Sequence, residues 1–292
     1  MNNNSYENPY PYKKVAFAVA FSPRLDAILS EAYRLYQVFN CELLFIHVGD
    51  KNTQKEKELE KKLAENKLPA QKREVIWEDG SPGNKLLDVC HEEEVDLLVL
   101  GALQRESLLS YYIGSVARKV CRKGDFSILL LTEPRSRPAP LEKIVVSAPE
   151  HPKTPVTLST ALHWGQEFKS KELFVVREST LYGFGKMISE DTMEEEEKFK
   201  EEFMKTENES LNRVLKQLNC QEDIQIKTEI VTGKPGYEIA KFAKNKNADL
   251  LVVNSPDSRL GIMDRFFPHD LEHVLADLPC SLLIVHPVEK EN

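Results

Sequence analysis

The stretch "EEEVDLLVLGA" at residues 92–102 returns as "NKNADLLVVNS" at residues 245–255, so that Asp96 has a counterpart in Asp249, 153 residues later. Each stretch carries a short run of Leu and Val bounded by polar residues. Such a run is typical of a strand that is buried on both faces of a parallel sheet. The chain therefore contains an internal repeat, and its fold is decided by one unit that occurs twice.

Three further pairs of segments extend the repeat in the same order. They are "KKVAFAVAFSP" (13–23) with "EKIVVSAPEHP" (142–152), "GSPGNKLLDVC" (80–90) with "GKPGYEIAKFA" (233–243), and "FSILLLT" (126–132) with "CSLLIVH" (280–286). The offset between copies rises from 129 residues in the first pair to 153 in the second. The second copy therefore carries 24 additional residues between its first strand and its Gly-x-Pro-Gly turn.

Each copy alternates short apolar runs with helical patterns. After the first run, Ile28, Ala32, Leu35 and Phe39 recur at helical spacing, and Pro82 occupies a favoured first-turn position of a later helix. This alternation predicts βαβ units with right-handed crossovers. We therefore predict an α/β chain of two Rossmann-like domains, each a five-stranded parallel sheet with helices on both faces.

The predicted domain boundaries follow the repeat. They are an N-terminal tail at 1–12, a first domain at 13–135, a linker at 136–141, and a second domain at 142–292 with a long helical insertion around 180–218. Within the insertion, one apolar helix face is predicted for Phe199, Phe203, Leu211, Val214, Leu215 and Leu218.

Composition excludes several classes of protein. The 292-residue chain has a net charge of −8 and lacks a basic stripe, which argues against binding to nucleic acid or to an anionic membrane surface. It has no signal-peptide pattern and no apolar run of the roughly 20 residues that a membrane span needs. Its five cysteines form no Cys-x-x-Cys pair, which favours a reduced, cytoplasmic location.

The repeat resembles the universal stress protein family in a tandem, two-domain form. The resemblance rests on the apolar first strand after a basic start, on "ELLFIHV" (42–48), on Gly-x-Pro before a helix, on "EEEVDLLVLGA", and on Gly-Ser after a loop. It implies a fold of the HUP class, similar to adenine nucleotide alpha hydrolases. It also implies that the last strands, around 127–131 and 281–285, meet so that the two domains form an intrachain pseudo-dimer.

In members that bind ATP, the resemblance implies a phosphate loop of the form G-x-x-G-x9-G-[ST] after the fourth strand. Glycines allow the backbone to approach phosphate closely, and a helix N-terminus adds free N–H donors. Gly101 matches the first glycine, and Gly114 and Ser115 match the final pair, whereas Gln104 replaces the second glycine. Arg105 could pair with phosphate. The loop thus predicts a degenerate, weak site for ATP or another adenine nucleotide with Mg²⁺. The alternative is that Gly101 ends a strand and Gly114-Ser115 starts a helix without any ligand.

Other determinants of the family's site are altered. Ala20 stands at or near the end of the first strand, where the family often has an acidic residue that contacts the nucleoside. In the second copy Asn254 and Asp257 replace the first glycines, and Pro268 with His269 replaces Gly-Ser. Because Pro268 has no N–H donor and Asp257 adds negative charge, we do not expect a nucleoside triphosphate in the second copy.

No catalytic or metal-ligating residue is assigned. "HDLEH" (269–273) matches a zinc-protease pattern in letters but falls where the first copy has "SVARK", at the start of a structural helix. His47 and His286 are interpreted as core histidines. The predicted function is ligand sensing or protein regulation under stress, through an unidentified protein partner. A ligand-free interaction scaffold is the alternative, and homodimer formation stays open. A slow ATP hydrolase would need a metal ligand and a water-positioning group that the sequence does not identify.

Overall fold

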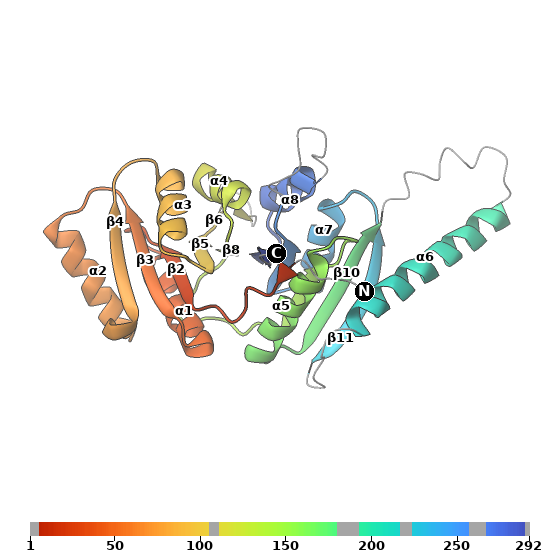
Figure 1. The fold of residues 1–292 in the computed structure, drawn as a ribbon, viewed down its shortest axis with the longest axis horizontal. Helices are drawn as coiled ribbons and strands as arrows, with labels where there is room; N and C mark the ends of the chain where they lie inside the picture. Colours follow the sequence, from red (N-terminus) through yellow and green to blue (C-terminus); the bar gives the residue numbers. More distant parts are fainter. Residues whose placement is uncertain (1–5, 105–110, 180–192, 217–223, 257–266, 290–292) are drawn as a thin grey trace.

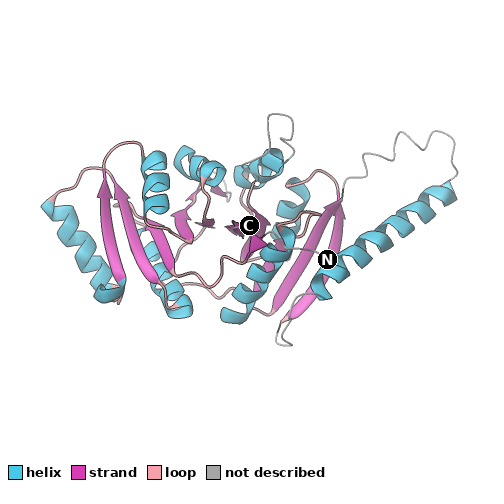
Figure 2. Cartoon of the chain, viewed as in Figure 1, coloured by secondary structure: helices cyan, strands magenta, loops and turns pink. Residues whose placement is uncertain are grey.

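A computed structural model describes residues 6–104, 111–179, 193–216, 224–256 and 267–289 (Figure 1). Through these residues runs one ten-stranded sheet in the order β11-β10-β9-β12-β13-β8-β5-β2-β3-β4. Helices cover both of its faces (Figure 2). The α/β fold class predicted from the sequence is confirmed. The strand arrangement differs in one respect, because the two predicted five-stranded sheets are continuous with each other.

The first half supplies five mutually parallel strands and four helices. The strands are β2 (Lys14–Ala18), β3 (Glu42–Val48), β4 (Arg73–Glu78), β5 (Leu97–Gly101) and β8 (Ser127–Leu131); the helices are α1 (Leu25–Phe39), α2 (Thr53–Glu65), α3 (Pro82–Glu92) and α4 (Ser115–Lys123). A short 3₁₀ turn, η1 (Ala70–Lys72), precedes β4. Numbered by their order in the chain, these strands lie in the order 3-2-1-4-5, which is the order of a doubly wound fold without its sixth strand.

The second half repeats this order. Its strands are β9 (Lys143–Ser147), β10 (Glu172–Ser179), β11 (Gln225–Thr232), β12 (Leu250–Asn254) and β13 (Ser281–Val285); its helices are α5 (Thr154–Glu167), α6 (Met193–Lys216), α7 (Tyr237–Lys246) and α8 (Phe267–Ala276). The insertion lengthens α6, which extends well beyond the edge of the sheet in Figure 1. Leu211 of α6 is fully buried, and Val214 and Leu215 pack against the same core.

The two halves join where β8 and β13 pair antiparallel, with Leu129 opposite Leu283 at the centre of the register. The last strands thus meet as the family resemblance implied. Both leucines are almost inaccessible to solvent. Pairing removes two exposed sheet edges, which would otherwise be open to association with other chains.

Each face of the sheet has its own hydrophobic core. One core contains buried residues of α1, α2, α5 and α6, and the other contains residues of α3, α4, α7 and α8. Both cores run across the β8–β13 junction, because leucines of these two strands point alternately to either face. The halves are therefore held by continuous packing as well as by backbone hydrogen bonds.

The N-terminal segment, predicted as a tail, lies against the second half. Strand β1 (Tyr6–Glu7) pairs antiparallel with β14 (Val288–Glu289), which brings the first and last described residues together. Tyr12 follows and is buried with a relative exposure of 1%. This segment crosses from the start of β2 to the helices of the other half.

The repeated "Asp-Leu-Leu" motif has a structural role at the amino end of each half. One carboxylate oxygen of Asp96 accepts hydrogen bonds from the backbone N–H groups of Lys13 and Lys14, at 2.6 and 2.8 Å. Asp249 accepts the equivalent bonds from Glu142 and Lys143, at 2.8 and 2.9 Å. The carboxylate therefore fixes the start of the first strand beside the fourth strand in both halves.

Replacing Asp96 by Ala should lower the free energy of unfolding by about 1–3 kcal/mol, because two backbone donors lose a charged acceptor. Urea denaturation followed by circular dichroism measures the change. The control is Asp88→Ala, which removes an exposed carboxylate from α3. Equal stability of the Asp96 and Asp88 variants would contradict the proposed role of the motif.

Candidate functional site

The carboxyl end of the first-half strands contains a topological switch point between β2 and β5. The chain leaves β2 towards β3 on one side and leaves β5 towards β8 on the other. Ligands of open α/β sheets bind in the crevice at such a point. Gly101 lies here as the last residue of β5, opposite Leu131 of β8. Ala20, which follows β2, is exposed at the same end.

The two ends of the loop after β5 pair with each other as short strands. Strand β6 (Leu103–Gln104) pairs antiparallel with β7 (Tyr111–Tyr112), so Leu103 is opposite Tyr112. The backbone at Gln104 is thus part of a ladder with Tyr111, whereas a second loop glycine was the family pattern. Arg105 lies outside the described residues. Because Gly101 and Gly114 each lie two residues beyond the Leu103–Tyr112 pair, the hairpin brings these glycines towards each other.

Neither packing nor backbone conformation requires glycine at position 101. Its φ lies outside the left-handed region, and a Cβ there would be 3.6 Å from the Cδ1 atom of Ile28, an ordinary contact. Gly101 is exposed at the end of its strand. The missing side chain therefore leaves the end of β5 open to close approach by a ligand.

Gly114 is the N-cap residue of α4, with φ −67° and ψ 170°, and no side chain in the described part of the chain caps this helix. The first-turn N–H groups, beginning at Ser115, point out of the helix N-terminus and carry its positive dipole end. Such an end attracts anions. Gly101 at the end of β5 and Gly114 and Ser115 at the start of α4 therefore lie at the two ends of the same loop.

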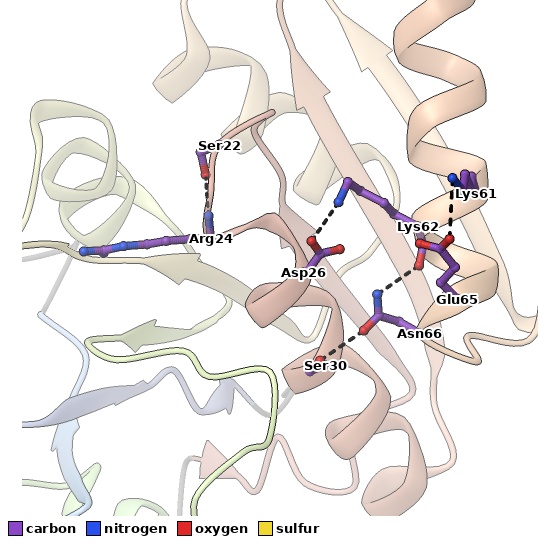
Figure 3. Close-up of polar contacts among 8 residues, drawn as sticks. All are labelled: Ser22, Arg24, Asp26, Ser30, Lys61, Lys62, Glu65 and Asn66. Atoms are coloured by element: carbon purple, nitrogen blue, oxygen red, sulfur yellow. Dashed lines mark hydrogen bonds and ion pairs between the residues drawn. The ribbon is translucent and has the colours of Figure 1, made fainter.

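Arg24 is a cation of this crevice that the sequence analysis did not find. Its Nη1 donates a hydrogen bond of 2.7 Å to the carbonyl oxygen of Ala102, directly after β5. Figure 3 shows the Arg24 side chain extending away from the neighbouring ion pair between Asp26 and Lys62. The repeat held a signal for it, because "SPRL" with Arg24 aligns with "HPKT" with Lys153 at the offset of 129 residues.

Lys153 has the corresponding position in the second half and is buried, with a relative exposure of 5%. Its ammonium group donates to the carbonyl and hydroxyl oxygens of Ser255, at 3.2 and 3.1 Å, and to the carbonyl oxygen of Pro256, at 3.1 Å. Both halves therefore use a cation from the start of the first helix to hold the backbone that follows the fourth strand.

At the end of its fourth strand the second half carries a larger side chain than the first half does. Asn254, the counterpart of Gly101, is buried between threonines of α5. Its side-chain oxygen accepts a bond of 2.5 Å from Thr157, and its amide donates to Thr154 at 3.2 Å. Helix α8 begins at Phe267, so that Pro268, which has no N–H group, lies in its first turn. Asp257 lies outside the described residues.

A cavity of about 230 Å³ lies in the crevice of the second half, and Asn254 helps to line it. Its walls are largely apolar, from Pro149, Ile239 and Val253, but Glu150 and Glu178 also line it. The Glu178 carboxylate accepts backbone bonds from Gly236 and Ile239, at 3.1 and 2.8 Å, so it already occupies the N-terminus of α7. Carboxylates at this cavity oppose the binding of a phosphate group.

The "HDLEH" segment joins the two halves through Glu272. Its carboxylate forms ion pairs with Arg118 and, at 2.6 Å, with Arg122, both from α4 of the first half. Burial acts to raise the pKa of the Glu272 carboxyl, but the hydrogen bonds and charges of the two arginines lower it by more. The net pKa therefore lies below the ordinary value. In the described ranges, no three His, Cys, Asp or Glu side chains are grouped so that they could hold a metal ion.

His47 lies at the carboxyl end of β3 and is buried among aromatic rings. Phe21 and Trp77 contact it edge to face at centroid distances of 5.0 and 4.9 Å. Its Nδ1 lies 3.0 Å from the carbonyl oxygen of Val19. These contacts agree with its interpretation as a core histidine.

Comparison with known proteins identifies the family. The model of the universal stress protein family matches residues 11–132 and 143–286. The chain belongs to the universal stress protein family. A universal stress protein from Methanocaldococcus jannaschii is 29% identical over 90 residues, which are 31% of this chain and 52% of the relative. The chain thus spans about half the length of this curated relative.

Solved structures share the fold of this universal stress protein over its whole length. One from Archaeoglobus fulgidus, a universal stress protein, aligns with a TM-score of 0.62 at 14% identity, covering 98% of this chain and 99% of its own. A protein of unknown function from Pseudomonas aeruginosa aligns with a TM-score of 0.68 at 14% identity, covering 96% and 94%. No helix in the described ranges has the length and apolar character needed to cross a membrane.

Replacing Glu272 by Gln should lower the free energy of unfolding at pH 7 by about 1 kcal/mol, because Arg118 and Arg122 lose their charged partner. The folded pKa of Glu272 is lowered, so its contribution is complete above the ordinary Glu pKa of 4.5 and is lost as the pH falls through the folded value. The difference between wild type and variant should therefore shrink in acid.

Denaturation midpoints measured between pH 3 and pH 7 test this expectation. Glu209→Gln, an exposed position on α6, is the control and should change stability little at any pH. A Glu272→Gln effect that stays constant across the pH range would show that the ion pairs do not supply it.

Proposed function

We propose that this universal stress protein is a stress-response regulator that senses an adenine nucleotide at the carboxyl edge of its first half. The observation that carries the proposal is the uncapped N-terminus of α4 beside the open end of β5. The ligand is ATP or another adenine nucleotide, with Mg²⁺ held by its phosphates.

In this proposal, the backbone N–H groups around Gly114 and Ser115, together with the Ser115 hydroxyl, hold the phosphate chain. Gly101 allows close approach at the end of β5. Gln104 and Arg105 are the loop contacts. Because Gln104 replaces a glycine, the loop offers less backbone to the phosphates, and binding is expected to be weak.

The two halves differ in the side chains at the carboxyl ends of their strands. Gly101 is bare, whereas Asn254 is buried and bonded to threonines of α5. The end of β3 carries Val48, whereas the aligned position in β10 is Glu178, which caps α7. These differences favour one nucleotide site per chain.

Sensing is favoured over catalysis because the proposed site includes no nucleophile, general base or metal-ligand set. A slow hydrolase would require groups beyond the residues assigned here. The cytoplasm is the proposed location. It is supported by Cys41, Cys90, Cys121 and Cys280, which are all buried free thiols.

A second candidate is a ligand-free scaffold whose halves act as a pseudo-dimer that presents one rigid surface to a protein partner. The pairing of β8 with β13 and the ion pairs of Glu272 with α4 favour it, because both fix the halves relative to each other. Adenine nucleotide retained by freshly purified protein favours the first candidate over the second.

Replacing Gly114 by Val should reduce the affinity for ATP with Mg²⁺ at least tenfold, because a branched side chain at the N-cap blocks the approach of phosphate to the helix N-terminus. Isothermal titration calorimetry on the full chain measures the affinity. Wild type should bind weakly, between micromolar and millimolar, at one nucleotide per chain.

The matched control is Ala64→Val, which adds the same branched group at an exposed position of α2. It should leave the affinity unchanged, and circular dichroism should show that both variants are folded. Equal affinities of wild type and Gly114→Val would mean that this loop does not hold the nucleotide.

A further inference from the structure

The N-terminal segment and the linker between the halves are copies of each other. "NPYPYKK" (8–14) aligns with "RPAPLEK" (137–143) at the offset of 129 residues, with both prolines retained. Residues 8–12 were predicted as part of a tail and residues 137–141 as part of a linker, both outside the repeat. Each copy enters the first strand of its own half after crossing a helix of the other half.

The N-terminal copy fills the space over α5 with aromatic rings. Tyr10 stacks on His163 at a centroid distance of 4.7 Å, and its hydroxyl donates to the Glu167 carboxylate at 3.1 Å. Burial and this contact with Glu167 raise the pKa of Tyr10 to about 12, so the hydroxyl keeps its proton. Tyr12 is buried beside Trp164.

The linker copy carries no aromatic ring over α1. Ala139 stands where the N-terminal copy has Tyr10, and Leu141 stands where it has Tyr12. Arg34 corresponds to His163, and its Nη1 donates to the Ala139 carbonyl at 3.0 Å. A cavity of about 470 Å³ lies here, and Ala139, Leu141 and Arg34 help to line it. This volume is within the usual range of small-molecule sites.

The cavity is lined by a buried carboxylate, Glu31, on an otherwise apolar face of α1. Glu31 is 5% exposed on a helix face that otherwise presents Ile28, Ala32 and Leu35 to the core. It forms an ion pair of 2.6 Å with Arg34, and both residues line the cavity. Burial raises the pKa of Glu31. An apolar pair here would usually be at least as stable, so the ion pair points to a use other than stability.

Arg34 has hydrogen-bonding capacity left over. Its guanidinium lies 5.0 Å from the centre of the Phe168 ring. Nη1 and Nη2 are taken by Ala139 and Glu31, but Nε is buried without a hydrogen-bond partner in the described part of the chain. The exposed side chains of Glu133 and Arg135 also line the cavity, so it is open to solvent.

We propose that this cavity binds a small phenolic ligand, whose ring lies beside Ala139 and Leu141, where the N-terminal copy has the rings of Tyr10 and Tyr12, and whose hydroxyl contacts the Glu31–Arg34 pair. The site is separate from the proposed nucleotide crevice, since it is lined by the middle of α1, the linker and the starts of β12 and β13. Occupancy would link the two halves across the linker.

Calorimetric titration of the full chain with p-cresol, the isolated tyrosine side chain, tests the proposal. Wild type should show saturable binding of one p-cresol per chain, and toluene, which lacks the hydroxyl, should bind at least fivefold more weakly. Ala139→Tyr should reduce p-cresol affinity at least tenfold, because the chain then supplies its own ring. The control Ala64→Tyr adds the same ring at an exposed position of α2 and should change nothing.

A second variant keeps the test independent of how the introduced tyrosine ring packs. Glu31→Gln should weaken p-cresol binding at least threefold and leave toluene binding unchanged, because only the contact with the hydroxyl is altered. The proposal is overturned if wild type shows no saturable p-cresol binding, if toluene binds as tightly as p-cresol, or if both variants bind p-cresol as wild type does.

Discussion

The antiparallel pairing of β8 with β13 is the contact on which the rest of the architecture depends. A parallel five-stranded sheet ends in an open edge at its last strand, and each half of this chain has such an edge. Pairing Leu129 opposite Leu283 closes both edges at once and makes the two hydrophobic cores continuous. This pairing sets the position of one half relative to the other. The linker, the N-terminal segment and the ion pairs of Glu272 add further contacts between them.

Because the two halves share one frame, their differences are easy to interpret. The backbone after the fourth strand is held by Arg24 in one half and by Lys153 in the other, so this function is kept. The bare end of the strand is kept only at Gly101, since Asn254 fills its counterpart. The two halves thus share the cation that holds this backbone and differ in the side chain at the end of the fourth strand.

The sequence was sufficient to predict the α/β architecture that the two halves share. The offsets between repeated segments, together with the Val- and Leu-rich runs, predicted the α/β class, and the resemblance implied that the last strands meet. It was not sufficient for features that depend on side chains distant in the chain. The partners of Arg24, Asn254 and Glu272 lie between 78 and 154 residues away, and no local pattern shows them. The hairpin at Gln104 was missed because its two strands have only two residues each.

The N-terminal segment shows a different limit. It was predicted as a tail before the first repeated segment, yet it shares its Pro-x-Pro spacing with the linker and so belongs to the repeat. Alignment from the first apolar strand onwards concealed this similarity. The difference between the copies becomes clear only in the structure, where Tyr10 packs on His163 and Ala139 lines a cavity.

The central claim is that one frame, used twice, offers one nucleotide site. Native mass spectrometry of the full chain in excess ATP with Mg²⁺ tests it most directly, because it counts ligands on each chain. The account predicts that the bound population saturates at one nucleotide per chain. Saturation at two nucleotides per chain, or no bound nucleotide at millimolar ATP, would contradict it.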